Sequence, residues 1–454
     1  MENNKEFLGK EPIGKLLLKL AIPSVIAQVV NMLYNIIDRV YIGHMEDVES
    51  IALTGVGVCL PLILIVSAFA ALVSSGGAPR ASIKMGEKDY DGAEVILGNC
   101  FTLQIIISFV LTICLLLFNE QLLMAFGGSD KTISYATSYM NIYALGTIFV
   151  QLTLGMNGFI SCQGFTKHSM ISVAIGAVIN IILDPIFIFA FKMGVSGAAL
   201  ATVIAQGAST IWVLSFLRGK KTNLKLKLSN MKLRANVIFP CILLGLATFI
   251  MQASESVIAI CFNSSLQFYG GDLEVGAMTI LSSVMQFAMM PMQGVAQGAQ
   301  PIISYNYGAK NKDRVVKIFK LLTLVCLIYS LTLWSSIMAF PNAFANIFTS
   351  DATLVPFTAK MLRIYCAGLG IFGIQIACQM TFVSIGSSLS SITVAVFRKI
   401  IILIPLIYII PHLVNDPVIG VYLAEPIADI TAVLFTICLF SFKFKKALNK
   451  ISIK

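Results

Sequence analysis

Apolar runs of roughly 20 residues recur along the whole chain, and short polar stretches separate them. Six lie in the first half, near Leu16–Ile42, Ile51–Ser74, Val95–Phe118, Tyr135–Met156, Met170–Phe191 and Gly197–Leu217. Six more lie in the second half, near Val237–Phe262, Val275–Val295, Ile318–Phe340, Phe357–Phe382, Val394–Ile410 and Val421–Phe442. A helix of this length crosses the hydrocarbon core of a bilayer. The pattern predicts an all-α integral membrane protein with twelve transmembrane helices.

The two halves of the chain share residues at a constant spacing. Pro79, Ser82, Gly86, Lys88 and Asp91 recur at this spacing as Pro301, Ser304, Gly308, Lys310 and Asp313. Gly164 and Gly386 keep the same spacing, and after a shift of one position Gly197, Leu200, Ala201, Ile204 and Ala205 match Gly420, Leu423, Ala424, Ile427 and Ala428. Because six spans return the chain to its starting side, we expect two parallel six-helix repeats with a transport path between them.

Charge gives the repeats an orientation. Hydrophobic residues make up 57% of the chain and charged residues only 12%, which is typical of a membrane protein. With both termini in the cytoplasm, 27 of the 32 Lys and Arg residues fall inside, leaving Arg39, Lys131, Lys192, Lys360 and Arg363 outside. We therefore expect an N-terminal lobe over 1–218, a basic cytoplasmic linker over 219–236, and a C-terminal lobe with a short basic tail over 237–454.

Several other kinds of chemistry find no support in the sequence. The net charge of +10 follows from the basic inner loops, which face anionic lipid headgroups, so no nucleic-acid partner is expected. The ten cysteines lack zinc-ligand spacing, and His44, His168 and His412 lie too far apart for a local metal motif. The glycine pairs at 76–77 and 127–128 lack the Lys-Ser/Thr of a phosphate-binding loop. We predict neither an enzyme nor a cofactor, so transport would draw on an ion gradient. No cleavage site follows the first apolar segment, which we expect to remain as a span.

Five carboxylates lie inside or near the ends of apolar runs: Asp38, Asp184, Glu255, Glu425 and Asp429. Each costs about 2.5–3.5 kcal/mol on insertion scales, so each is a candidate functional residue. Residues four apart on a helix share a face, which places Asn180 beside Asp184. Pro185 removes a backbone hydrogen bond there. At ~1.5 Å per residue, Asp38, Asp184 and Thr202 lie at similar depths in the outer part of the bilayer, where they could form one polar pocket.

Each candidate also has a structural interpretation. Asp38 could pair with Arg39 at the membrane surface, and Asp184 could make a packing hydrogen bond with Asn180. Glu255 could have a functional role, or it could take part only in local packing. Glu425 and Asp429 lie near the outward end of the last run, where snorkelling or surface exposure would also explain them.

Several strings together resemble the multidrug and toxic compound extrusion family over essentially the whole chain. They are Ile22-Pro23-Ser24 with Asp38, Gly77-Ala-Pro-Arg80 with Gly86, Asn180-Ile-Ile-Leu-Asp184-Pro185, Gly194-Val-Ser-Gly197-Ala-Ala, Pro291-Met-Gln-Gly294-Val-Ala-Gln-Gly298-Ala-Gln-Pro301, Tyr305-Asn-Tyr-Gly-Ala-Lys310, and Phe397-Arg398 through Pro405. The tyrosine-containing loop and Ala424-Glu425-Pro426-Ile-Ala-Asp429 look most like the MepA-type bacterial subgroup.

The resemblance implies two lobes that rock about a central cavity, driven by inward flow of protons or sodium ions. Asp38, Asn180, Asp184 and Thr202 match the cation site of the N-terminal lobe, where a Na⁺ ion would bind. Pro23 matches a proline at which the first helix is proposed to bend. Glu255 matches an acid of a subgroup that couples through the C-terminal lobe, but Ile364–Thr381 lacks the partner acid.

The resulting hypothesis is a secondary active multidrug efflux antiporter that exports lipophilic cationic drugs and dyes. It would be a monomer in a bacterial inner membrane. Adaptable Met side chains suit varied ligands, and Met285 and Met292 flank the candidate cavity residues. That candidate set is Glu255, Gln286, Met289 and Met290, with Gln293 nearby. One alternative is a lipid-linked oligosaccharide flippase, which would line its cavity with arginine. Another is a receptor or channel.

Overall fold

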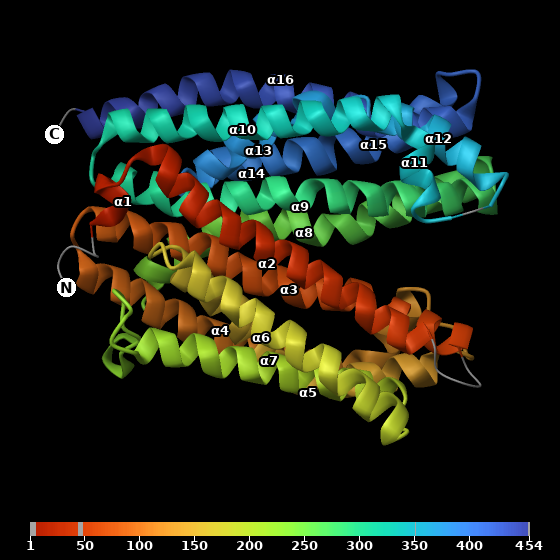
Figure 1. The fold of residues 1–454 in the computed structure, drawn as a ribbon, viewed down its shortest axis with the longest axis horizontal. Helices are drawn as coiled ribbons and strands as arrows, with labels where there is room; N and C mark the ends of the chain where they lie inside the picture. Colours follow the sequence, from red (N-terminus) through yellow and green to blue (C-terminus); the bar gives the residue numbers. More distant parts are fainter. Residues whose placement is uncertain (1–5, 44–48, 350, 453–454) are drawn as a thin grey trace.

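The computed structural model describes residues 6–43, 49–349 and 351–452, and these are almost entirely helical (Figure 1). His44 lies outside the described residues. Six long segments build the first bundle: α2 (Ile13–Gly43), α3 (Glu49–Gly86), α4 (Tyr90–Ala125), α5 (Ile133–Ser161), α6 (Thr166–Pro185) continued by the π-helical η2 (Ile186–Ala190), and α7 (Val195–Arg218). A short N-terminal helix, α1 (Phe7–Lys10), precedes them, and η3 (Leu228–Asn230) follows them.

The second bundle repeats this order with more interruptions. It contains α8 (Ala235–Tyr269), α9 (Asp272–Gly308), α10 (Lys312–Ala339), α11 (Pro341–Asn346), α12 (Leu354–Tyr365), α13 (Leu369–Ser384), α14 (Ser388–Val396), the π-helical η4 (Phe397–Leu403), α15 (Ile404–Ile409), η5 (Ile410–His412) and α16 (Pro417–Ser452). α14 to η5 together form one span, Ser388–His412.

The described residues contain 11 helices long and apolar enough to cross a membrane, and a bent pair that would be one more. The pair is α12 and α13, whose axes differ by 51° across a short break. Counting the pair as one span gives twelve, which confirms the predicted all-α membrane architecture. The apolar side chains that remain exposed, such as Phe109, Leu117 and Ile211, are those expected to face lipid.

The repeat is visible in backbone details. Lys88 and Lys310, which are matched by the sequence repeat, both have positive φ angles, of 64° and 59°. The next residues, Asp89 and Asn311, both cap a helix: each side chain accepts a hydrogen bond from the backbone N–H three residues later. Since the same turn precedes α4 and α10, the sequence repeat corresponds to a structural repeat.

The two bundles touch through backbone at matched positions. A Cβ atom on Gly86 would overlap the carbonyl oxygen of Tyr305, and one on Gly308 would overlap that of Ile83. Ile83 and Tyr305 are separated by the same spacing as Gly86 and Gly308, so the contact obeys the pseudo-twofold symmetry of the repeat. Only glycine permits this approach.

These contacts lie toward the end of the molecule that carries α1 and the end of α16, and the bundles diverge toward the opposite end (Figure 1). α1 itself bridges to the second bundle. The amide of Asn306 and the guanidinium of Arg314 both donate to the carbonyl of Leu8, and Arg314 also donates to the carbonyl of Glu11. The lobes therefore form a V whose closed end lies at the termini.

Candidate functional site

The first candidate site lies between α6 and α7. The amide nitrogen of Asn180 donates to Oδ1 of Asp184 at 3.1 Å and lies 3.4 Å from the hydroxyl of Thr202. Asn180 and Asp184 are fully buried, and Thr202 is nearly so. One turn of α6 thus places amide and carboxyl groups on a single face, as their spacing requires.

Asp38 of α2 completes this site. Its carboxyl group lies close enough to that of Asp184 for the two side chains to interact. Two phenols lie nearby: Tyr34 is near both carboxyl groups, and Tyr139 is near Asp38 and the hydroxyl of Thr202. The structure therefore brings together Asp38, Asn180, Asp184 and Thr202, from three helices of one lobe.

This arrangement can hold a small cation. Oδ2 of Asp184 and Oδ1 of Asn180 are buried and have no hydrogen-bond partner among the described residues. Two neighbouring carboxylates repel each other when both are ionised. Such a pair therefore shares a proton or binds a metal ion between its two groups. Carboxylate, amide and hydroxyl oxygens are hard ligands, which suit a proton or Na⁺ better than a transition metal. No group of three or more His, Cys, Asp and Glu side chains that could hold a metal ion occurs in the described part of the chain.

Pro23, the predicted bend, lies in the same helix as Asp38. α2 continues as one helix through Pro23. Pro23 lies in the part of α2 that is nearer the closed end of the V. At that level, the hydroxyl of Ser24 donates to the carbonyl of Leu20, which lies within one turn of Pro23. The helix therefore contains a proline at which its backbone hydrogen bonding is already incomplete.

The predicted drug-cavity residues lie on the second lobe. On α9, Gln286, Gln293 and Gln297 are exposed, and the amide of Gln28 on α2 donates to Gln297 at 3.1 Å across the lobes. Met289 and Met290 are half-buried, whereas Met292 is buried. Exposed amides on a membrane helix indicate a face turned to water or to another polar surface rather than to lipid. Met292 is a packing residue of the lobe.

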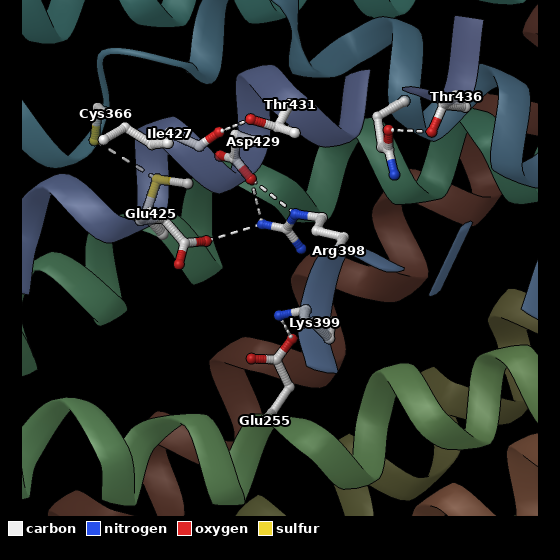
Figure 2. Close-up of polar contacts among 11 residues, drawn as sticks. Glu255, Cys366, Arg398, Lys399, Glu425, Ile427, Asp429, Thr431 and Thr436 are labelled. Carbon is white, nitrogen blue, oxygen red and sulfur yellow. Dashed lines mark hydrogen bonds and ion pairs between the residues drawn. The ribbon is translucent and has the colours of Figure 1, made fainter. Parts of the chain in front are cut away.

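A cluster of charges that the sequence did not predict lies inside the second lobe (Figure 2). Arg398 of η4 donates through Nε to Asp429 at 2.7 Å and through Nη2 to Glu425 at 2.8 Å, both on α16. Its guanidinium stacks on the ring of Phe372, 4.6 Å from the centroid. All three charged residues are buried, so the interpretation of Glu425 and Asp429 as surface residues is wrong. Their spacing of four places them on one face of a helix and was the signal that could have indicated a common partner.

Lys399, next along η4, points the other way, toward α8 (Figure 2). Its ammonium lies 2.7 Å from the carboxylate of Glu255. Glu255 therefore has a basic partner in place of the missing acid of the tenth span. Arg398 and Lys399 are among the 27 basic residues that the sequence assigned to the inner loops or their margins, but both lie well inside the span that begins at Ser388. The excess of inner basic residues persists without them.

The two sites occupy related places in the repeat. The spacing that relates Gly197 to Gly420 also relates Thr202 to Glu425. Each lobe therefore uses the same position of its last span for a polar pocket, and in the second lobe the guanidinium of Arg398 fills that pocket.

Comparison with known proteins places this geometry in a family. The family model described as MatE matches residues 23–186 and 246–409, one match in each lobe. The multidrug export protein MepA of Staphylococcus aureus (strain NCTC 8325 / PS 47) is 24% identical over 434 residues, covering 94% of each chain.

Solved structures share the whole fold. A crystal structure described as MATE in the bent conformation has a TM-score of 0.92 at 21% identity, covering 99% of both chains. An outward-facing conformation of a multidrug resistance MATE family transporter of the MOP superfamily has a TM-score of 0.91 at 22% identity, covering 98% of both. With a family model matched in both lobes and twelve spans in two bundles, this chain belongs to the MatE family of membrane proteins.

Proposed function

We propose that this protein is a secondary active multidrug exporter, which moves lipophilic cationic compounds out of a bacterial cell in exchange for protons or sodium ions. The observation that carries the proposal is the pocket in which Asp38 and Asp184 face each other beside Asn180 and Thr202. The names of the relatives, which are multidrug export proteins, support the substrate class.

Exchange follows from competition for these carboxyl groups. A proton or Na⁺ ion and a cationic drug both lower the electrostatic cost of holding the two acids side by side, so one species weakens binding of the other. The ion must also favour one arrangement of the lobes, because a ligand with equal affinity for both arrangements shifts nothing. Backbone contact between the lobes is concentrated at one end of the V, so rocking about the central cavity would separate the lobes at this end as they close at the other.

Efflux from proteoliposomes tests the function. Purified protein should transport ethidium when a pH gradient or a sodium gradient, imposed separately, drives the exchange. Asp184→Asn should abolish this transport. A wild-type protein that moves no cationic dye under either gradient would contradict the proposal. The flippase alternative predicts transport of a polyprenyl-phosphate sugar instead. A flippase would need arginine side chains in its cavity to bind phosphate. The buried guanidinium of Arg398 does not serve this role, because it is already held by two carboxylates.

The orientation is also a proposal, based on the basic loops, and places both termini and the closed end of the V in the cytoplasm. Lys88 and Lys310 lie in matched exposed turns there. In a cysteine-free background, Lys88→Cys and Lys310→Cys should react with an impermeant maleimide in inside-out vesicles and not in intact cells. Efficient labelling of either residue from outside would reverse the topology.

A further inference from the structure

The two adjacent basic side chains of the second lobe, Arg398 and Lys399, differ in how completely protein carboxylates neutralise them. Arg398 is enclosed by Glu425, Asp429 and the ring of Phe372, and all four side chains are buried. A ligand could reach this guanidinium only by displacing two buried carboxylates. Arg398 is therefore a fixed part of the lobe and offers nothing to a ligand.

Lys399 is held differently. Its side chain is only 7% exposed, and the one ion pair it makes in the described residues is to Oε1 of Glu255 at 2.7 Å. The Glu255 side chain is 57% exposed. Because a charged side chain inside a membrane-spanning helix avoids lipid, the exposed part of Glu255 on α8 faces a water-filled space. The anion that neutralises Lys399 therefore comes from the accessible side.

The energetics of separating this pair are asymmetric. A buried ammonium without an anion is strongly unfavourable. An exposed carboxylate that leaves its partner regains water at little cost. Lys399 therefore needs an anion, but the anion need not be Glu255. Any carboxylate that arrives from the cavity can take its place, and Glu255 is then free to face a cationic group.

We propose that Lys399 and Glu255 form a separable ion pair that binds amphoteric compounds: a ligand carboxylate pairs with Lys399, and Glu255 turns to the cationic part of the ligand. The inference rests on the proposed export function and deepens it by assigning the two residues that would receive the opposite charges of one ligand. It makes the two lobes complementary in selectivity, with an acidic pocket for cations in the first lobe and a neutral, divisible pair in the second.

Two dyes that differ only in this charge provide the test. Rhodamine 110 carries a delocalised cation and a free carboxylate, and rhodamine 123 is its methyl ester, which keeps only the cation. Fluorescence anisotropy on detergent-solubilised protein, without any gradient, gives a Kd for each dye. The ratio of the two Kd values cancels contacts that both dyes share and reports the carboxylate alone.

Lys399→Gln should shift this ratio against rhodamine 110 by roughly tenfold, the size of one charge-assisted contact. It should also tighten rhodamine 123, because Glu255 loses its internal partner. Glu255→Gln should shift the ratio the other way, because Lys399 loses its competitor. Since Glu255→Gln leaves a buried unpaired charge, the double variant provides a fold-safe check and should shift the ratio against rhodamine 110 as Lys399→Gln does.

Lys443→Gln, which removes an exposed lysine on α16, is the matched control and should change neither dye. A ratio that stays constant in all variants, or moves in the same direction in both single variants, overturns the inference. If the wild-type protein binds rhodamine 123 but the ratio does not respond, only this inference fails. If it binds neither dye, the proposed export of cations fails as well.

Discussion

The polar pocket of the first lobe and the charge cluster of the second lobe occupy related positions of one repeat, yet they are neutralised in opposite ways. In the first lobe, Asp184 is buried and makes no ion pair within the described residues. In the second lobe, Glu425 and Asp429 are equally buried but share Arg398. A buried carboxylate without a cationic partner favours uptake of a proton or a cation from solution, whereas carboxylates held by a buried guanidinium are already neutralised.

The comparison teaches that duplication supplies a scaffold and that the charges at one position decide its use. Thr202 and Glu425 are repeat partners, and each takes part in its own lobe's polar network. The first network leaves two buried oxygen atoms without a hydrogen-bond partner among the described residues, namely Oδ1 of Asn180 and Oδ2 of Asp184. We therefore expect substitutions in the first lobe to change transport and those around Arg398 to change stability.

The largest expected effect is in the first lobe. Asp184→Asn should leave the protein folded but reduce gradient-driven ethidium efflux to background, because a neutral amide cannot exchange a cation. Asp38→Asn should behave alike, and the double variant should be little worse than either, since residues that act as a unit are not additive. Efflux rates in proteoliposomes give the result, and normal efflux by a well-expressed Asp184→Asn protein would remove the site assignment.

The second lobe should respond in stability. Arg398→Gln leaves Glu425 and Asp429 buried without a cation, and breaking a buried ion pair in this way costs on the order of 3–5 kcal/mol. Thermal unfolding in detergent should show a large drop in Tm, while Asp184→Asn in the first lobe should show none. The triple variant Arg398→Met, Glu425→Leu, Asp429→Leu should recover most of the loss. A stable but inactive Arg398→Gln protein would instead give this cluster a direct role in transport.

A smaller effect should arise where the lobes meet. Gly86→Ala and Gly308→Ala each place a Cβ against a carbonyl oxygen of the opposite lobe, which disfavours the arrangement closed at this end. Because the two contacts are related by the repeat, both variants should slow efflux to a similar degree, about tenfold for ~1.4 kcal/mol. Gly14→Ala is the control, since its Cβ would meet nothing within 4 Å. Unequal effects would show that the two contacts do not act symmetrically.

The sequence predicted most of this fold because membrane constraints leave strong signals. Long apolar runs located the spans, and the constant spacing of the repeat located matched turns such as those at Lys88 and Lys310. Asp38, Asp184 and Thr202 could be placed at one depth from their distances to the ends of the apolar runs, and Asn180 could be placed beside Asp184 from the spacing of four. Their role in coupling stays a prediction.

The charge cluster was missed because its partners come from different spans. Arg398 and Lys399 lie near the start of an apolar run and were assigned to the inner loop, since the sequence does not show that the helix begins well before them, at Ser388. Glu425 and Asp429 could be interpreted as surface residues because the sequence does not show that Arg398 packs against them. Only tertiary packing puts α16 and α8 on opposite sides of η4.

The smallest expected effect compares the two matched helix caps. Asp89 accepts from the backbone N–H of Gly92, and Asn311 accepts from that of Arg314. Removing either cap with alanine should cost about 1 kcal/mol of stability.

The Gly92 N–H, followed by the ammonium of Lys84, lowers the pKa of Asp89 below its usual 3.8. A carboxyl group with a lowered pKa stabilises the fold fully above its unfolded pKa, and this stabilisation disappears as the pH falls through the folded value. The cost of Asp89→Ala should therefore shrink below about pH 4, whereas that of Asn311→Ala should not change. Thermal unfolding of both variants between pH 3 and 7 measures the difference, and a parallel pH profile for the two would show that the charge of Asp89 adds nothing to its cap.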